Sequence, residues 1–197
     1  MVGIFLDFSK AFDTVNHQIL LDKLNIYGIR GIANDWIRSY LHQRSQFCTY
    51  DNCKSTSKYI NCGVPQGSIL GPLLFLIYIN DLHQATNQSD IILFADDSNI
   101  FTHSKTIPEI QAKLNTEIPK LVTWLQSNRL FLNIDKTHAM IFGTKNVQIK
   151  NSLQVQVEGK ILQNVSKTKF LGVIIDDQLN WKPHIQYTSN IYCQKSL

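Results

Sequence analysis

The chain has 197 residues, of which 44% are hydrophobic and 17% are charged, and this balance excludes a disordered chain, which is poor in apolar residues. Four cysteines are too few for a disulfide framework in a chain of this length. The length itself suits one domain with a sizeable hydrophobic core. The formal net charge of +4 permits a polyanionic partner without requiring one.

The first elements in the chain are a short strand and a helix. Residues 2–6 are all apolar or glycine and predict a buried strand that ends at Asp7. Asn16 is a suitable N-cap for a helix that ends near Gly28. The apolar face of this helix is predicted to contain Ile19, Leu20, Leu24 and Ile26.

A second helix, a polar segment and a third helix follow. The predicted apolar face of the second helix contains Ile32, Trp36, Ile37, Tyr40 and Leu41. Residues 45–62 are rich in Ser, Thr, Tyr and Cys and predict a pair of polar strands. Pro72 suits the first turn of an apolar helix that extends to about Leu82.

The second half of the chain predicts mostly strands around one long helix. Residues 91–94 and 99–102 predict two strands on either side of an Asp-Asp pair, and residues 108–128 have the apolar spacing of a helix. Further strands are predicted at residues 138–142, 153–157 and 169–175. Mixed strands and helices in this order favour an α+β fold, an antiparallel sheet with helices packed on one face.

Cysteine spacing and apolar runs argue against a zinc site and a membrane segment. Cys48, Cys53 and Cys62 form no C-x-x-C pair, and no histidine pair follows at finger spacing, so we expect reduced structural thiols. The longest apolar run, residues 69–79, is about half the length of a membrane span. Asp7 interrupts the apolar start of the chain, and no basic segment precedes it, so no signal peptide is predicted.

Two segments place carboxylates at the ends of apolar strands, with Asp7 after residues 2–6 and Asp96 and Asp97 after residues 91–94. A carboxylate at the tip of a buried strand is costly unless it is paired or binds a cation. Magnesium prefers a few carboxylate oxygens together with phosphate oxygens, and two such ions about 4 Å apart suit phosphoryl transfer. A two-metal site is predicted if these strands are neighbours, whereas an isolated Asp-Asp pair is more simply a polar turn.

Two further segments carry polar groups that such a site could use. Residues 63–75 read Gly-Val-Pro-Gln-Gly-Ser-Ile-Leu-Gly-Pro-Leu-Leu-Phe, a shaped loop that enters a helix. Its glycines allow the backbone to approach a ligand closely, and Gln66 offers a neutral donor and acceptor. Residues 130–137 read Leu-Phe-Leu-Asn-Ile-Asp-Lys-Thr and place Lys136 after an apolar stretch. Taken singly, the loop is a helix entry and the lysine is a surface residue.

The order of these segments resembles the palm domain of reverse transcriptases, and in particular the polymerases of jockey-type non-LTR retrotransposons. Residues 6–13, Leu-Asp-Phe-Ser-Lys-Ala-Phe-Asp, look like motif A, and residues 63–75 look like motif B. Phe-Ala-Asp-Asp at 94–97 looks like motif C, although relatives often have tyrosine at the position of Phe94. Residues 130–137 look like motif D, and Phe-Leu-Gly-Val at 170–173 looks like motif E.

The resemblance implies roles for single residues in RNA-directed DNA synthesis. It implies that Asp7, Asp96 and Asp97, with the Phe8 carbonyl, hold two Mg²⁺ ions, for which Mn²⁺ could substitute. It assigns Lys136 to the pyrophosphate as general acid. The remaining substrate-binding residues that it implies are Lys10 and Ala11 at the triphosphate, Phe12 as the gate against a 2′-hydroxyl, and Gln66 and Gly67 in the nucleotide pocket.

The resemblance also implies a domain plan and partners. Residues 1–175 would form the palm of a right-hand polymerase, with most of the fingers missing, and residues 176–197 would start a truncated thumb or connection. The expected partners are an RNA template, a DNA primer and dNTPs, with no membrane. The expected location is intracellular, in the nucleus and the cytoplasm.

Two other interpretations compete with an active polymerase palm. One is a truncated element remnant with intact motifs and no polymerase activity of its own. The other is a different two-metal enzyme with a palm fold, such as a nucleotide cyclase, against which the Pro-Gln-Gly block at 65–67 argues.

Overall fold

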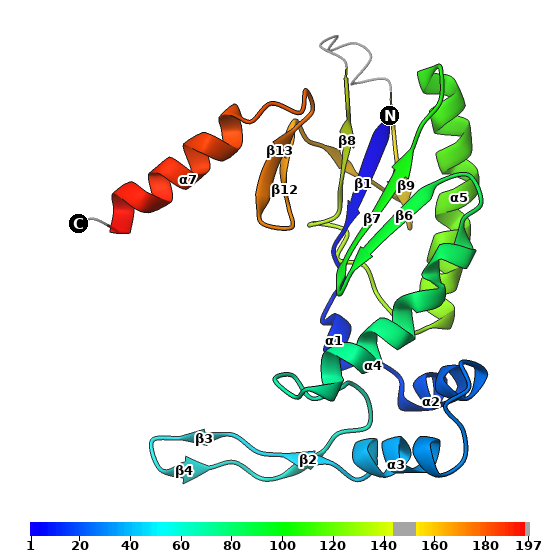
Figure 1. Ribbon diagram of the computed structural model, residues 1–197, viewed down its shortest axis with the longest axis vertical. Coiled ribbons are helices and arrows are strands. Elements are labelled where there is room, and N and C mark those ends of the chain that lie inside the picture. Colours follow the sequence, from blue (N-terminus) through cyan, green and yellow to red (C-terminus); the bar gives the residue numbers. More distant parts are fainter. Residues whose placement is uncertain (144–152, 196–197) are drawn as a thin grey trace. The chain divides into compact units, whose positions relative to one another are not determined.

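The computed structural model describes residues 1–143 and 153–195 (Figure 1). Its chain divides into two compact units. The sheet unit comprises Met1–Asp7, His83–Thr123 and Leu132–Leu197, and the helical unit comprises Phe8–Leu82 and Trp124–Phe131. In the described ranges, no helix is both long and apolar enough to cross a membrane.

The sheet unit is built on five strands in the order β11-β8-β1-β7-β6. In chain order these are β1 (Val2–Leu6), β6 (Asp90–Phe94), β7 (Asp97–Thr102), β8 (His138–Ile141) and β11 (Gln163–Asn164). The central strand β1 pairs antiparallel with β7 and β8, and β6 pairs antiparallel with β7. Only the short edge strand β11 departs from the predicted antiparallel sheet, since it pairs in parallel with β8.

Burial within the sheet unit explains why β1 is apolar throughout. All five residues of β1 are buried, as expected for a central strand that is covered on both faces. The long helix α5 (Ile107–Ser127) confirms the predicted helix and supplies a stripe of buried side chains at helical spacing. These side chains are Ile110, Leu114, Ile118 and Leu121 in the sheet unit and Leu125 in the helical unit.

An aromatic cluster covers the face of the sheet that carries Phe5. Phe5, Met140 and Phe142 are buried there, and Phe170 and Ile175 pack against them. The last two belong to the hairpin of β12 (Lys167–Phe170) and β13 (Val173–Asp176), which precedes α7 (Lys182–Lys195). Another small hairpin joins β9 (Gln156–Val157) to β10 (Lys160–Ile161).

The β12–β13 hairpin corrects the single strand predicted over 169–175. Phe170 pairs directly with Val173, so Leu171 and Gly172 form a two-residue turn with φ of 46° and 87°. Positive φ at both positions is the geometry of a tight hairpin turn. The apolar sequence concealed this turn because leucine rarely adopts a positive φ.

The helical unit contains α1 (Ala11–Thr14), α2 (His17–Ile26), α3 (Ile32–Leu41), α4 (Leu70–Ile79) and the first half of the 3₁₀ helix η1 (Asn80–Ala85). The predicted N-cap is confirmed, because Asn16 Oδ1 accepts a hydrogen bond from the Ile19 N–H at 3.1 Å. The helix α2 packs against both α3 and α4.

Two predicted helix faces are wrong in part. Ile26 is 75% exposed and Ile32 is 90% exposed, although both were placed on apolar faces by their spacing. Asn34 is buried instead, and its Nδ2 donates to the Leu21 and Ile29 carbonyls at 3.0 and 3.1 Å. Both N–H groups of the Asn34 amide thus have acceptors, which allows this polar side chain to be buried.

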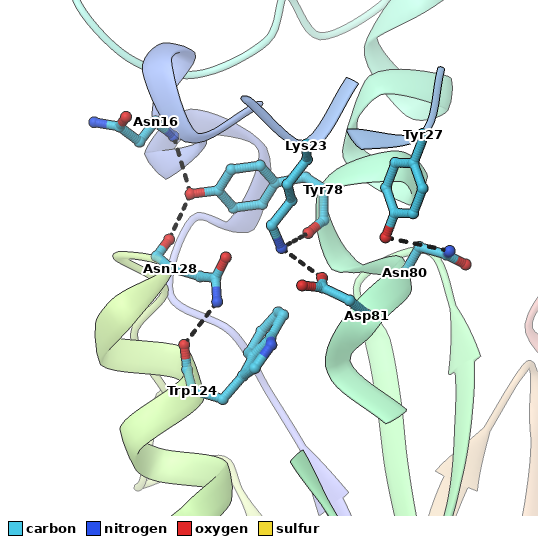
Figure 2. Close-up of polar contacts among 8 residues, drawn as sticks. All are labelled: Asn16, Lys23, Tyr27, Tyr78, Asn80, Asp81, Trp124 and Asn128. Carbon is cyan, nitrogen blue, oxygen red and sulfur yellow. Dashed lines mark hydrogen bonds and ion pairs between the residues drawn. The ribbon is translucent and has the colours of Figure 1, made fainter. Parts of the chain in front are cut away.

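A buried lysine links three segments of the helical unit (Figure 2). Lys23 Nζ on α2 donates to the Tyr78 carbonyl at 2.6 Å and to Asp81 Oδ1 at 2.5 Å. It lies 4.7 Å from the centre of the Trp124 ring. Burial lowers the pKa of Lys23, and the hydrogen bond and charge of Asp81 oppose this shift. The Tyr78 hydroxyl in turn donates to the Asn128 carbonyl at 2.5 Å.

A long two-stranded ribbon confirms the predicted pair of polar strands. It consists of β2 (Ser45–Gln46) paired with β5 (Lys58–Tyr59), and of β3 (Thr49–Tyr50) paired with β4 (Cys53–Lys54). Figure 1 shows this ribbon extending away from α3. The four cysteines are free thiols, and all of them are exposed rather than part of the core.

Candidate active site

The strand register of the sheet unit brings three carboxylates to one end of the sheet. Leu6 at the end of β1 pairs with Ser98 of β7. The next position in this antiparallel register holds Asp7 on one chain segment and Asp97 on the other, so these two residues lie at the same end of the two neighbouring strands. Phe94 pairs with Asp97, which places Asp96 in the two-residue turn between β6 and β7. The adjacent turn residue Ala95 has a φ of 51°, so the turn is tight.

Asp7 and Asp96 are close enough to Asp97 to affect its ionisation. Burial raises the pKa of Asp97, and the charges of Asp96 and Asp7 raise it further. Like charges at short range disfavour the ionised form, and a bound cation removes this cost. The site therefore has the electrostatic character of a cation-binding site.

The carboxylate oxygens at this site are suitable ligands for magnesium, although the three side chains are not arranged around a common point in the structure. Asp7, Asp96 and Asp97 supply hard carboxylate oxygens, which Mg²⁺ prefers, and leave room for phosphate oxygens. Across residues 1–143 and 153–195, no group of three or more His, Cys, Asp or Glu side chains is arranged tightly enough to hold a metal ion. Phe8 is buried and belongs to the helical unit.

Lys136 lies with two of these carboxylates in one small pocket of about 120 Å³. Asp7 and Asp97 line this pocket together with Asn99 and His138. The structure thus places Lys136 beside Asp7 and Asp97, and its predicted role at the pyrophosphate stays a prediction. A cation here offsets the repulsion among the acids and can approach a negatively charged ligand that they face.

Two residues of the loop that carries Lys136 hold the backbone of Asp7, and sequence reasoning missed both. The Asn133 N–H donates to the Asp7 carbonyl at 2.7 Å. The Asp7 N–H donates to Thr137 Oγ1 at 3.2 Å, and this hydroxyl donates to the Asn133 carbonyl at 2.9 Å. Thr137 is 1% exposed. In the sequence, Thr137 is simply a polar residue next to Lys136, and nothing in its neighbourhood indicates that its hydroxyl contacts Asp7, 130 residues away.

The helical unit holds the other predicted site residues. Lys10 is exposed at the start of α1 with a φ of 52°, and Ala11 is buried behind it. Phe12 is half-buried, and its ring centre lies 4.6 Å from that of Phe75. The Val64 N–H donates to the Phe12 carbonyl at 2.8 Å, which fastens the glycine-rich loop to α1.

The glycine-rich loop is shaped by a close backbone approach. A Cβ on Gly63 would lie 2.8 Å from the Asp13 carbonyl oxygen, and the φ of Gly63 is +87°, so only glycine fits there. Gln66 is exposed, and its Nε2 donates to Asp13 Oδ1 at 2.9 Å. Gly67 is exposed at the turn with a φ of +79°. The loop and α1 therefore form one polar surface.

This polar surface borders a pocket of about 680 Å³, a volume within the range of small-molecule sites. Lys10 and Gln66 line it, as do Asp13, Arg44 and Tyr59, which sequence reasoning did not select. Asp13 could have been noticed as the last residue of the acidic segment 6–13. Arg44 and Tyr59 reach the pocket only through the folding of the two-stranded ribbon, so their spacing gave no signal.

Comparisons with known proteins identify the family of the chain. Residues 1–175 match the family model described as reverse transcriptase (RNA-dependent DNA polymerase). The chain is 28% identical to the RNA-directed DNA polymerase from mobile element jockey of Drosophila melanogaster, over 93% of this chain and 20% of that protein. It is 31% identical to the jockey polymerase of Drosophila funebris, over 92% of this chain and 20% of that protein.

Solved structures share the fold. Apo telomerase from Candida tropicalis, truncated from its C-terminal domain, superposes with a TM-score of 0.59 at 18% identity, covering 91% of this chain and 34% of that one. Telomerase from Candida albicans in complex with a fragment of telomeric RNA has a TM-score of 0.59 at 13% identity, covering 89% of this chain and 30% of that one. The chain spans about a fifth of the length of the curated relatives described above.

Proposed function

The chain belongs to the reverse transcriptase family, and on this premise we propose that it is the palm of an RNA-directed DNA polymerase of a non-LTR retrotransposon. The proposed reaction joins the primer 3′-hydroxyl oxygen to the α-phosphorus of a dNTP and breaks the bond to pyrophosphate. The observation that carries the proposal is the convergence of Asp7, Asp96 and Asp97 at one end of a sheet. An RNA template, a DNA primer and dNTPs are the proposed partners.

The three carboxylates are proposed to hold two Mg²⁺ ions, with the Phe8 carbonyl as a further ligand and Mn²⁺ as a substitute. When bound, such ions activate the attacking hydroxyl and stabilise the charge on the leaving oxygen. Asp7, Asp96 and Asp97 would hold these ions, whose positive charge would offset the repulsion among the carboxylates. Lys136, in the pocket with Asp7 and Asp97, is proposed to donate a proton to the pyrophosphate oxygen.

The helical unit is proposed to bind the incoming nucleotide. The Lys10 and Ala11 amides would face the triphosphate, and Gln66 and Gly67 would line the nucleotide pocket. Phe12 would lie below the sugar and exclude a 2′-hydroxyl. This assignment is supported by the pocket that Lys10 and Gln66 share and by the loop contacts that fix Phe12.

The domain plan is part of the same proposal. Residues 1–175 would be the palm, and residues 176–197, which include α7, would connect it to a thumb. Because such a polymerase acts on chromosomal DNA, we place its work in the nucleus after synthesis in the cytoplasm.

The test is primer extension on an RNA template with Mg²⁺, using this chain alone and fused to the preceding region of the jockey polymerase. Template-directed extension by either form supports the proposed function. A folded protein that incorporates no nucleotide in either form, with Mg²⁺ or Mn²⁺, contradicts it and favours an inactive element remnant.

We expect Phe12→Val to admit ribonucleotides, lowering the preference for dNTP over rNTP by about tenfold or more, because a smaller side chain leaves room for the 2′-hydroxyl. The measurement is single-nucleotide extension with matched dNTP and rNTP. Phe12→Tyr keeps the ring and is the control that should retain discrimination. Unchanged discrimination by an active Phe12→Val protein would refute the gate.

Thr137→Val is expected to slow single-turnover incorporation by about tenfold or more, because it removes the acceptor of the Asp7 N–H and loosens a proposed metal ligand. The KM for dNTP should change little, since Thr137 acts as a positioning residue. Thr137→Ser should retain the rate. Thr116→Val removes a hydroxyl from an exposed position of α5 and is the matched control. Equal rates for Thr137→Val and Thr116→Val would exclude the positioning role.

A further inference from the structure

The two-stranded ribbon of the helical unit carries a set of cationic and aromatic side chains that the proposed catalytic groups do not include. We call this set the ribbon surface. It consists of the exposed residues Phe47, Tyr50, Lys54, Lys58 and Tyr59, together with Arg44, which is half-buried. The ribbon lies between two proposed site segments in the sequence, after α3 and before the glycine-rich loop.

Backbone pairing holds the ribbon in a defined shape. The Ile60 N–H donates to the Arg44 carbonyl at 2.8 Å and closes its base. At its tip, Tyr50 pairs with Cys53, and the intervening Asp51 and Asn52 have φ of 45° and 62°. A tight turn of this kind matches the right-handed twist of the strands. The side chains of the ribbon surface therefore project from an ordered support.

The aromatic residues of the ribbon have no core to fill. Tyr50 is 84% exposed, Tyr59 is 76% exposed and Phe47 is 49% exposed. A two-stranded ribbon has no hydrophobic layer behind it, and large exposed aromatic side chains grouped in one place mark an interaction surface. The two tyrosine rings are available as stacking platforms.

Cationic groups accompany these rings. Lys54 Nζ lies 3.7 Å from the centre of the Phe47 ring, which holds the ammonium group on the ribbon. Arg44 lies 5.2 Å from the Tyr40 ring of α3. Residues 44–60 contain three cationic side chains and one carboxylate, so this short segment carries half of the chain's formal net charge of +4.

The ribbon surface is continuous with the proposed nucleotide pocket. Arg44, Gln46 and Tyr59 at the base of the ribbon line the same pocket as Lys10 and Gln66. The ribbon carries both cations and rings, and Lys58 and Tyr59, as neighbours in β5, point to its opposite faces. Aromatic rings for bases and cations for phosphates are the features by which proteins bind single-stranded nucleic acids.

We propose that the ribbon surface binds the single-stranded RNA template as it approaches the nucleotide pocket. Tyr50 and Tyr59 stack on unpaired bases, and Arg44, Lys54 and Lys58 contact phosphates. The identity of this RNA as the template rests on the proposed function, whereas its binding to the ribbon does not require catalysis. Paired bases in a duplex are already stacked on one another, so a duplex offers the two rings few free base faces.

The test measures binding of a fluorescently labelled twelve-nucleotide oligo(U) RNA to the full 197-residue chain, in EDTA, by anisotropy. We expect Tyr50→Ala/Tyr59→Ala to weaken binding by about tenfold or more, because each stacked base contributes substantially. We expect Lys54→Gln/Lys58→Gln to weaken binding and to reduce the slope of log Kd against log salt by about 1.4, or 0.7 for each phosphate contact.

Matched controls separate the ribbon from general surface effects. Tyr192→Ala removes an exposed tyrosine of α7, and Lys105→Gln/Lys160→Gln makes the same charge change on exposed positions of the sheet unit. Both controls should bind like the wild type. All four altered ribbon residues are exposed, so their variants should keep the wild-type melting temperature.

Three results would overturn the proposal. The first is that the wild type does not bind oligo(U). The second is that the ribbon variants and the control variants bind oligo(U) equally well, as expected if the ribbon surface binds a protein partner. The third is that the wild type binds oligo(dT) but not oligo(U). Ribbon-dependent RNA binding without any primer extension would sink the proposed function and leave the ribbon assignment standing.

Discussion

Asp96→Asn is expected to reduce nucleotide incorporation by more than about 100-fold while leaving the fold at least as stable as the wild type. Mutating a residue that only supports a metal ligand typically lowers metal affinity or activity by about 10- to 100-fold. Removing a direct ligand should therefore lower activity by more than that. The measurement is single-turnover extension of a primer on an RNA template, with saturating Mg²⁺ and dNTP.

The stability part of this prediction follows from the electrostatics of the three carboxylates. The charges of Asp96 and Asp7 contribute to the raised pKa of Asp97, so Asp96 destabilises the metal-free site. An asparagine at this exposed turn removes the repulsion and keeps the side-chain shape. Without metal, the free energy of unfolding should stay unchanged or increase by up to about 1 kcal/mol.

A matched control distinguishes loss of a ligand from loss of charge on the β6–β7 hairpin. Asp90→Asn makes the same change at the other end of β6, where the side chain is 76% exposed. This control should extend primers like the wild type. A large loss of stability in Asp96→Asn would mean that Asp96 is structural, and full activity would remove it from the proposed metal site.

Lys23→Met is expected to lower the free energy of unfolding by about 2–3 kcal/mol, because it leaves Asp81 without its buried partner. The Lys23 side chain is 10% exposed and that of Asp81 is 26% exposed, so the loss should lie toward the lower end for buried ion pairs. The Tyr78 carbonyl also loses its donor, which adds to the cost. The measurement is urea unfolding followed by circular dichroism.

A double-mutant cycle isolates the ion pair. Lys23→Met/Asp81→Leu replaces both charges by apolar groups and should recover part of the stability that Lys23→Met loses. Lys113→Met is the matched control, since Lys113 is bonded at the surface to the His103 carbonyl. It should change stability by less than about 0.5 kcal/mol. A similarly small change in Lys23→Met would show that the lysine does not hold the helical unit together.

The candidate site was predictable to the extent that its residues lie within short segments. Asp7, Asp96 and Asp97 follow apolar strands in the sequence, and the register of β1 and β7 brings them to one end of the sheet. Lys136 shares a pocket with Asp7 and Asp97, and Lys10 and Gln66 share a second pocket. The roles of these residues in binding and catalysis stay predictions.

Residues that act through distant partners could not be found this way. Thr137 supports Asp7 through a hydrogen bond that spans 130 positions, and its sequence neighbourhood contains no trace of this contact. Arg44 and Tyr59 reach the pocket because Ser45 pairs with Tyr59 across the ribbon. The spacing of side chains predicts which residues share one face of a helix or strand. Which other segment packs against that face depends on the tertiary structure.

The strand β1, the Asn16-capped start of α2, the long helix α5 and the family were all predictable before folding, because local propensity and short motifs specify these features. The burial of Lys23 and Asn34 and the exposure of Ile32 became visible in the folded chain. The same is true of the hairpin turn at Leu171. Burial depends on which neighbouring element covers a side chain and satisfies its polar groups, and those neighbours come from distant parts of the chain.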